Sequence, residues 1–233
     1  MTKNKPIISI LMACLLLFGV FGWTVTARAE IASGTCGTCN WVIDDEGTLT
    51  ISPADGTSGT LDSISSNQSW PWFSNRTSIK KVIVEEGVAA SADAVGMFGA
   101  MTKCTDFQVG SLDTSATTNM ANMFTNCTSL VDTSGLARWD TGNVTNMNSM
   151  FNGCTSLADT SAFADWDTGK VTDMSSVFND CALTGTSDFA NWDTSNATTM
   201  SGMFSNCRSL SDTSDLANWD TSNVTNMRNM FGN

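Results

Sequence analysis

Apolar side chains recur at helical spacing through the second half of the chain. In the stretch NVTNMNSMFNGCTSL, which begins at Asn143, they follow the order i, i+3, i+6, i+7 and i+10. The residues concerned are Val144, Met147, Met150, Phe151 and Cys154. Such a stripe is typical of a short amphipathic helix. With a polar turn at 141–143 before it and Gly153 at its end, the pattern predicts a helix over residues 144–153.

The same stretch is repeated along the chain. Its other versions read ATTNMANMFTNCTSL, KVTDMSSVFNDCAL, NATTMSGMFSNCRSL and NVTNMRNMFGN. Four of the repeats contain one tryptophan each, and successive tryptophans are 27, 26 and 27 residues apart. Leu112 occupies the equivalent position 27 residues before the first tryptophan. These tryptophans are Trp139, Trp166, Trp192 and Trp219. A fixed period of this length is typical of a solenoid, in which each unit packs on the next.

A polar arm connects one stripe to the next. In the arm TSLADTSAFADWDTG the apolar contacts come from Leu157, Phe163 and Trp166, which are too few for a second long helix. The arm therefore predicts an extended segment with a short strand, followed by a turn. The expected fold is an α/β solenoid, a leucine-rich-repeat-like stack of short strand plus short helix units.

The segment before the repeats has the period of strands. NWVIDDEGTLTISP alternates apolar and polar residues around Asp-Glu-Gly, which predicts a β-hairpin, and SIKKVIVEEGV predicts a third strand from Ile79 to Val84. We expect residues 30–90 to form a β-rich cap on a repeat array over 91–233, with about five units and the last one truncated. The loop tryptophans of the WPWF stretch, 70 and 72, are interpreted as buried cap residues, with a ligand platform as the alternative.

The first residues have the order of an export signal. A basic start is followed by an apolar stretch over 7–21 and an A-x-A site that ends at Ala29. Residues 1–29 are therefore predicted to be a signal peptide. A lipobox at 11–14 fits less well because apolar residues continue beyond it. An uncleaved anchor is a further alternative, since about 20 apolar residues are enough to span a bilayer.

Charge and composition exclude several classes of partner. After cleavage 8 basic residues face 23 acidic ones, a net charge of −15, which repels nucleic acid and anionic lipid. The chain has no histidine, the commonest general base and metal ligand, and no tyrosine. We expect no enzyme activity, no catalytic, cofactor-binding or metal-ligating residue, no nucleic-acid partner, and no membrane insertion after cleavage.

Seven cysteines remain after cleavage, and six of them fall into two settings. Cys36 and Cys39 form a C-x-x-C in a polar entry segment, without the second pair that a four-cysteine zinc site needs. A local disulfide and plain thiols are both open for this pair. Four others lie three residues after the repeated phenylalanine, which predicts a column of buried thiols. Metal binding or redox activity by this column is the alternative. They are Cys127, Cys154, Cys181 and Cys207.

An aspartate follows each repeat tryptophan. These are Asp140, Asp167, Asp193 and Asp220, with Asp113 upstream. The Asp-Thr-Ser/Gly-Asn context favours capping of the following turn, while carboxylates in a column are also able to hold Ca²⁺. The tryptophan column is interpreted as core, with stacking on sugars as the alternative. These two columns define the alternative function, a carbohydrate- or calcium-binding surface module.

The unit LARWDTGNVTNMNSMFNGCTSL resembles the repeat, about 26 residues long, of BspA-like leucine-rich-repeat surface proteins. The entry SGTCGTCNWVIDDEGTLTIS, with its later PW and IKKVIVEEGV, resembles the region often found ahead of such repeats. The resemblance implies a leucine-rich-repeat-like solenoid on a secreted or cell-surface protein, often bacterial. It also implies adhesion, with partners among host matrix proteins or microbial surfaces, and it carries no catalytic residues.

The chain departs from the pattern of that family in two places. Met101 stands in the first repeat where cysteine is expected, with Cys104 displaced, and the chain stops just short of the next column cysteine. An incomplete reading frame or fragment is therefore expected.

Inward positions are nearly constant between copies, whereas outward ones vary. The pair at 148–149 changes from Asn-Ser to Ser-Ser, Ser-Gly and Arg-Asn, and the pair at 137–138 from Ala-Arg to Ala-Asp and Ala-Asn. A constant core under a variable surface predicts a non-enzymatic protein-interaction and adhesion scaffold, secreted or at the cell surface.

Overall fold

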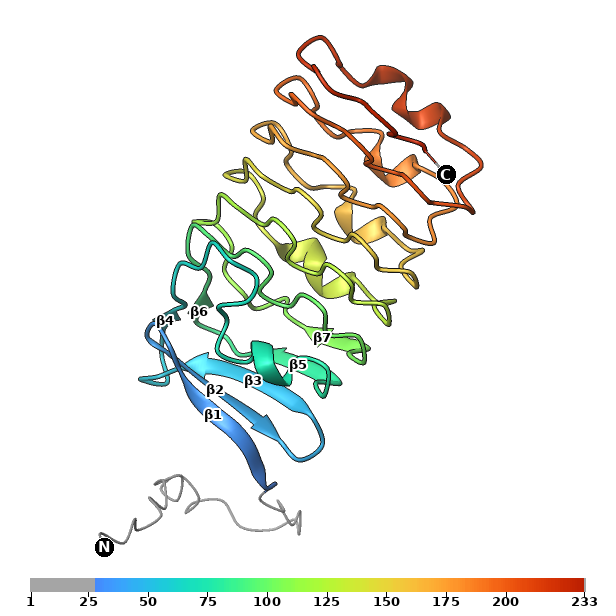
Figure 1. The fold of residues 1–233 in the computed structure, drawn as a ribbon. Coiled ribbons are helices and arrows are strands. Elements are labelled where there is room, and N and C mark those ends of the chain that lie inside the picture. Colours follow the sequence, from blue (N-terminus) through green and yellow to red (C-terminus); the bar gives the residue numbers. More distant parts are fainter. Residues whose placement is uncertain (1–27, 233) are drawn as a thin grey trace, which may run out of the picture.

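β-strands dominate the N-terminal part of the protein, and short 3₁₀-helices mark the repeats that follow (Figure 1). The computed structural model describes residues 28–232, so most of the predicted signal peptide, with the lipobox, lies outside the described residues. The strands are β1 (Glu30–Cys36), β2 (Cys39–Asp44), β3 (Thr48–Pro53), β4 (Gly59–Thr60), β5 (Lys81–Val84), β6 (Val88–Ala89) and β7 (Asp106–Gln108). The 3₁₀-helices are η1 (Phe73–Asn75), η2 (Ser134–Arg138), η3 (Ser161–Phe163), η4 (Ser187–Phe189) and η5 (Ser214–Asn218).

Five strands form one mixed sheet in the order β1-β2-β3-β5-β7. The predicted hairpin is confirmed: β2 and β3 pair antiparallel, with Trp41 opposite Ile51 and Ile43 opposite Leu49. The predicted third strand is β5, which begins at Lys81 and pairs parallel with β3. β4 and β6 pair in a separate two-stranded sheet. Because β5 and β7 already run parallel, the sheet passes directly into the stacking of the repeats.

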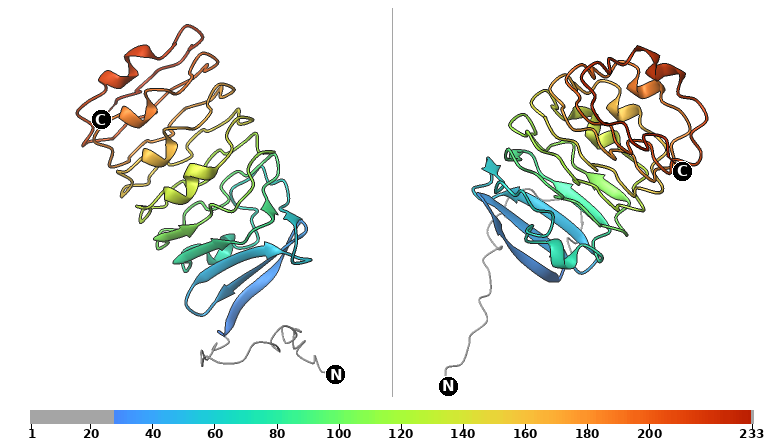
Figure 2. Two further views of the ribbon diagram at one scale, coloured as in Figure 1. Left: turned by 180° about the vertical axis from the view of Figure 1, so that it is seen from behind. Right: turned by 45° about the horizontal axis from the view of Figure 1, so that its top comes forward.

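Beyond β7 the repeats lie one above another (Figures 1 and 2). Neighbouring repeats are joined by single parallel bridges along one column, which comprises Asp93, Asn119, Asn146, Asp173, Thr199 and Asn226. Around each bridge, alternate backbone N–H groups donate to the next repeat. Ser149 donates to Ser175 at 2.8 Å, and Gly153 to Asn179 at 2.8 Å. The protein therefore has a repeat-type fold in which the backbone of each coil is completed by its neighbour.

The predicted helix over 144–153 is wrong. Within residues 28–232 there is no α-helix, and this stretch consists of consecutive β-turns. The N–H of Met150 bonds to the carbonyl of Met147 at 3.1 Å, and that of Cys154 to Phe151 at 3.0 Å. The third residue of each turn is left-handed, with φ of 56° at Ser149 and 76° at Gly153, as type II turns require.

Tandem turns reproduce the spacing of a helix. Two turns four residues apart place apolar side chains at i, i+3, i+4 and i+7, which are also the positions of one helical face. Met147, Met150, Phe151 and Cys154 are all buried, so the stripe is core as predicted. The backbone differs because alternate N–H groups, which a helix would bond internally, donate to the next repeat.

The arms between the stripes also differ from the prediction. They contain the helices η2 to η5 where an extended segment with a short strand was expected. In η3 the N–H of Phe163 bonds to the carbonyl of Thr160 at 2.9 Å, and the Phe163 side chain is fully buried. One 3₁₀ turn is enough to direct this ring into the core.

The core is a ladder of aromatic rings. Phe151 stacks on Phe124 with centroids 5.4 Å apart and on Phe178 at 5.7 Å, with interplanar angles of 4° and 1°. The ladder continues from Phe178 to Phe204 at 5.9 Å and from Phe204 to Phe231 at 5.6 Å. Because the repeats are evenly spaced along the sequence, equivalent phenylalanine rings stack at similar distances along the array.

The N-terminal end of this core is closed by the cap tryptophans. Trp70 and Trp72 are buried and stacked, with centroids 5.2 Å apart. Their indole N–H groups donate to the carbonyls of Val95 at 2.7 Å and Met97 at 2.8 Å. Both rings are therefore core residues of the cap, and the ligand-platform alternative is wrong.

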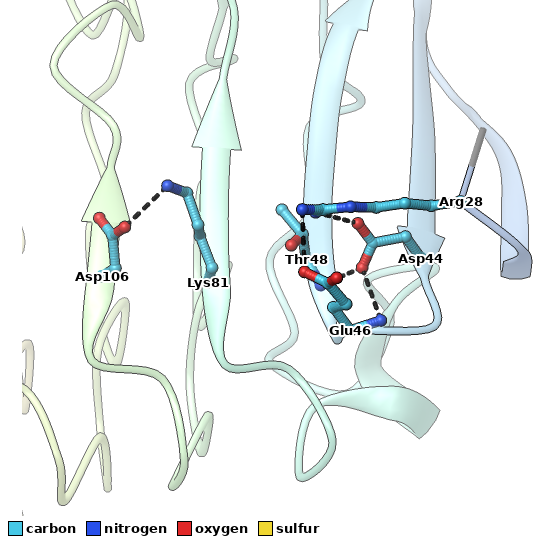
Figure 3. A network of polar contacts seen from close by, with 6 residues as sticks. All are labelled: Arg28, Asp44, Glu46, Thr48, Lys81 and Asp106. Atoms are coloured by element: carbon cyan, nitrogen blue, oxygen red, sulfur yellow. Dashed lines mark hydrogen bonds and ion pairs between the residues drawn. The ribbon is translucent and has the colours of Figure 1, made fainter. Parts of the chain in front are cut away.

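Ion pairs hold the edges of the N-terminal sheet (Figure 3). Arg28, directly before β1, pairs with Asp44 and with Glu46 at the end of the β2–β3 hairpin, each at 2.9 Å. Lys81 of β5 pairs with Asp106 of β7 at 2.8 Å. No ion pair joins two repeats in the part of the chain that the structure describes, so the repeats rely on packing and hydrogen bonds.

Candidate interaction surface

The repeat tryptophans lie in the core. Each indole N–H donates to a backbone carbonyl of the preceding repeat, for example from Trp166 to Leu136 at 3.2 Å and from Trp192 to Phe163 at 2.9 Å. All four members of the column are buried: Trp139, Trp166, Trp192 and Trp219. A ring that stacks on a sugar needs an open face, so this column gives no support to the carbohydrate alternative.

The column cysteines are buried free thiols. Each Sγ donates to the carbonyl of a phenylalanine in the preceding repeat, from Cys154 to Phe124 at 3.1 Å and from Cys181 to Phe151 at 3.2 Å. Burial raises the pKa of both thiols well above the ordinary value, which keeps them protonated and unreactive. The thiols thus fill the core and add a weak hydrogen bond between repeats.

The aspartate column lies on the surface and caps turns. Oδ1 of Asp140 accepts the N–H of Gly142 at 3.0 Å, and Oδ1 of Asp193 accepts that of Ser195 at 3.0 Å. A second set at 132, 159 and 212 caps the start of η2, η3 and η5 in the same way. Within residues 28–232 no three metal-ligating side chains gather at one point. The observed role of these carboxylates is thus the capping of turns.

Acid should destabilise the repeats through these caps. Hydrogen bonds from the serine two residues further along lower the pKa of six carboxyls: Asp113, Asp132, Asp159, Asp193, Asp212 and Asp220. Because the folded pKa lies below the unfolded value of about 3.9, their stabilisation is complete above that pH and is lost as the pH falls through the folded pKa. We expect the melting temperature by circular dichroism to fall as the pH is lowered from about 5 to about 2.

The matched control replaces Asp132, Asp159 and Asp212 by Asn. Asparagine keeps a turn-capping oxygen but does not titrate in this range. The triple variant should therefore lose less stability in acid than the parent chain. An identical acid profile in the two proteins would contradict the role assigned to the caps.

The variable exposed positions gather on the segments that carry η2 to η5. Four precede the helices and four lie at their ends or just after them, and all eight are exposed. We call them the η face: Val131, Ala158, Thr184, Ser211, Arg138, Asp165, Asn191 and Asn218. The helices themselves lie one above another along the array (Figure 1). The side chains of the η face thus vary along the array: the first set of four differs in every repeat, and the second set repeats a residue only at Asn191 and Asn218.

The bridge column and its neighbours form a more uniform surface. Thr145, Thr172 and Thr198 each donate the hydroxyl to the carbonyl of the corresponding threonine one repeat earlier, at 3.2, 3.1 and 3.0 Å. These hydroxyl groups are already used for stacking. The expected variable pair at 148–149 belongs to this region, and its second member is structural: Ser149 is left-handed, and the equivalent Gly202 is buried. The second half of that pair is therefore not free to vary as surface.

An open cleft adjoins the N-terminal end of the η face. It has a volume of about 550 Å³ and is lined in part by Glu85, Glu86, Gln108 and Arg138. Its lining includes residues of β5, β7 and η2. A second cleft of about 360 Å³, lined in part by Thr60 and Asp113, shares Ser111 with the first. The η face is thus continuous with a polar groove at the cap.

The repeats match a known family. Its description is "Mycoplasma protein of unknown function, DUF285", and it matches residues 92–183 and 158–233. Together the two matches cover residues 92–233, more than half of the 233-residue chain. The chain belongs to this family. The matches begin at residue 92, next to Asp93 of the bridge column, and leave residues 30–90 of this DUF285 protein outside.

One solved structure is similar to this DUF285 protein. It is a leucine-rich repeat protein from Eubacterium ventriosum, 19% identical, with a TM-score of 0.39. The match covers 80% of the DUF285 chain but only 45% of the other protein's length. No curated protein matches the chain. Among the described residues no helix is long and apolar enough to cross a membrane.

Proposed function

We propose that this DUF285 protein is an exported, non-enzymatic interaction scaffold, a solenoid of the BspA-like leucine-rich-repeat type. The observation that carries the proposal is the η face. Its exposed side chains change from repeat to repeat above a core of stacked phenylalanines that does not change. An interface assembled from such units gains area and specificity with each repeat.

The acidic surface supports a basic protein as the partner. The repeat aspartates cap turns on the surface, and no ion pair neutralises them within the described repeats. Complementary charge mainly increases the association rate and is screened by salt. A basic patch on a host matrix protein or a microbial surface protein fits this surface, whereas nucleic acid and anionic membranes do not.

The signal-like start of the chain supports export, and with it a secreted or cell-surface scaffold. Cleavage after Ala29 would remove Arg28 and with it the two ion pairs to Asp44 and Glu46. The backbone of β1 would keep its pairing with β2. Processing is thus compatible with the folded cap.

The test is to remove one repeat without disturbing the others. Deletion of residues 167–192 joins Trp166 to Asp193, the same junction that Trp166 makes with Asp167, so every column stays in register. The partner is first captured from host matrix and microbial surface proteins. We expect its Kd, measured by surface plasmon resonance, to rise roughly 5- to 30-fold, equivalent to about 1–2 kcal/mol, and binding to weaken with salt.

Single substitutions on the η face serve as matched controls. Asp165→Ala and Asn191→Ala remove exposed side chains from two different repeats, and each should weaken binding less than the repeat deletion does. Complete loss of binding from either single change would indicate a discrete site and would overturn the distributed interface. Turnover of a substrate by the purified chain would overturn the non-enzymatic proposal.

A further inference from the structure

Two cysteines of the cap face each other across a tight hairpin. Cys36 ends β1 and Cys39 begins β2, and the two are register partners in the antiparallel pair. Directly opposite residues in such a pair point to the same face, with Cα atoms about 4.5–5.5 Å apart, inside the range of about 4.4–6.8 Å that a disulfide needs. Both side chains are buried, with 2% and 0% of their surfaces exposed.

The turn between them is fixed by glycine. Gly37 is the first of the two central residues and has a φ of 59°, which suits a type II′ hairpin turn. A Cβ at Gly37 would lie 2.1 Å from the carbonyl oxygen of Thr60, so only glycine fits. Thr38 is held as well, since its N–H donates to the same carbonyl at 2.9 Å. The two thiols are therefore held opposite each other by the surrounding backbone.

The other described cysteines are placed differently. The four column thiols each donate to a phenylalanine carbonyl inside the core of the repeats, and Cys104 lies 3.6 Å from the carbonyl of Asp106. Within residues 28–232 no third metal ligand joins Cys36 and Cys39 in a site, and a zinc site needs at least three protein ligands. A metal is thus not supported at the hairpin, whereas a bond between the two sulfurs needs no further group.

We propose that Cys36 and Cys39 form a disulfide that clamps the edge strand β1 onto the cap. β1 is the outermost strand of the sheet, and most of its residues are exposed. In the sheet it pairs with β2 alone. A covalent bond at the closed end of this hairpin keeps the register of the pair and hinders the fraying that an edge strand otherwise undergoes.

The oxidant is a small disulfide such as oxidised glutathione. The thiolate of one cysteine attacks a glutathione sulfur, and a mixed disulfide forms as one glutathione thiolate leaves. The second cysteine then attacks the protein sulfur of the mixed disulfide and expels the second glutathione. The two protein thiols lose two electrons and two protons, and one oxidised glutathione becomes two reduced ones. This exchange is independent of the proposed binding function.

The bond forms while the hairpin folds. Burial is the main cause that raises the pKa of Cys36 to about 11, so the folded protein holds little of the reactive thiolate at neutral pH. In the unfolded chain the pair is exposed, with only two residues between the cysteines. Once the cap has closed over it, the disulfide is inaccessible, and reduction of the native protein should be at least about tenfold slower than reduction in denaturant.

The test refolds the full chain in a glutathione redox buffer, quenches it with acid and alkylates the free thiols. Trypsin cleaves after Arg28 and Arg76, so peptide 29–76 contains both cysteines of the hairpin and no other. We expect this peptide to be unalkylated and two hydrogens lighter than its reduced form, while the column cysteines are alkylated after denaturation. Alkylation of both Cys36 and Cys39, or their pairing with column cysteines, would overturn the proposal.

Two variants provide controls. Cys36→Ser should leave Cys39 alkylated, and Cys104→Ser should leave the hairpin disulfide unchanged. In the wild-type chain, hydrogen exchange of residues 30–36 should be slower in the oxidised than in the reduced form. Equal exchange rates in the two forms would overturn the clamping role. This measurement uses only the wild-type chain, so it does not depend on whether a variant folds.

Discussion

Replacing Phe151 by Ala should lower the free energy of unfolding by about 3–5 kcal/mol, the cost of removing a buried aromatic ring from a packed core. Phe151 is fully buried and stacks between Phe124 and Phe178, with Phe163 at 4.9 Å on its own repeat. A cavity here opens contacts on both neighbouring repeats at once. Urea titration followed by circular dichroism measures the change.

The matched control is Val131→Ala. Val131 lies on the η face with 58% of its surface exposed, so its truncation should change stability by no more than about 0.5 kcal/mol. The double variant Phe151→Ala, Phe178→Ala should deviate from additivity by about 0.5–3 kcal/mol because the two rings are in contact. A loss below about 1 kcal/mol for Phe151→Ala would contradict the stacked aromatic core.

The buried set of the repeats was predictable, whereas the path of the backbone was not. Met147, Phe151 and Cys154 are buried as the periodicity indicated, because tandem four-residue turns and one face of a helix share the same spacing. A signal against the helix was nevertheless present. The left-handed positions are occupied by glycine or by short polar residues in nearly every repeat, and those residues disfavour a helix interior. They are Asn122, Asn126, Ser149, Gly153, Ser176, Asp180, Gly202, Asn206 and Asn229.

Features that depend on contacts between neighbouring repeats were harder to predict from the sequence. The N–H of Phe151 finds its acceptor at Val177, 26 residues away, and no local pattern encodes that pairing. The 3₁₀ turn of η3 is three residues long, too short for any periodicity to appear. The strands of the cap, by contrast, were found because each alternates over several residues around a recognisable turn.

The candidate surface was predicted in part. Two of the positions expected to vary, Arg138 and Asp165, are exposed, the first at the end of η2 and the second just after η3. The pair at 148–149 looked equally variable, yet Ser149 serves the turn and not the surface. Variation among glycine, serine and asparagine marks a left-handed backbone position, while variation among arginine, aspartate and asparagine marks a solvated one. The chemical class of the variation therefore separates surface from strained backbone.

Replacing Gly153 by Val should lower the free energy of unfolding by about 2–3 kcal/mol, because a β-branched residue is strained at positive φ. Gly153 has a φ of 76°, and a Cβ built on it lies 2.4 Å from Oδ1 of Asn126. Its own N–H donates to the carbonyl of Asn179 at 2.8 Å, so the backbone cannot relax without losing a bond to the next repeat. Urea titration again measures the loss.

Two further substitutions separate backbone strain from a general effect of removing glycine. Gly153→Asn should cost about 1 kcal/mol or less, since asparagine tolerates the left-handed region and already occupies the equivalent places at 126 and 206 with φ of 56° and 58°. Gly185→Ala, where the added Cβ meets nothing within 4 Å, should be neutral or stabilising by about 0.4–1 kcal/mol. If Gly153→Val and Gly153→Asn proved equally destabilising, steric crowding against Asn126 would be the cause. The left-handed turn would then not be what sets the path of the chain through each repeat.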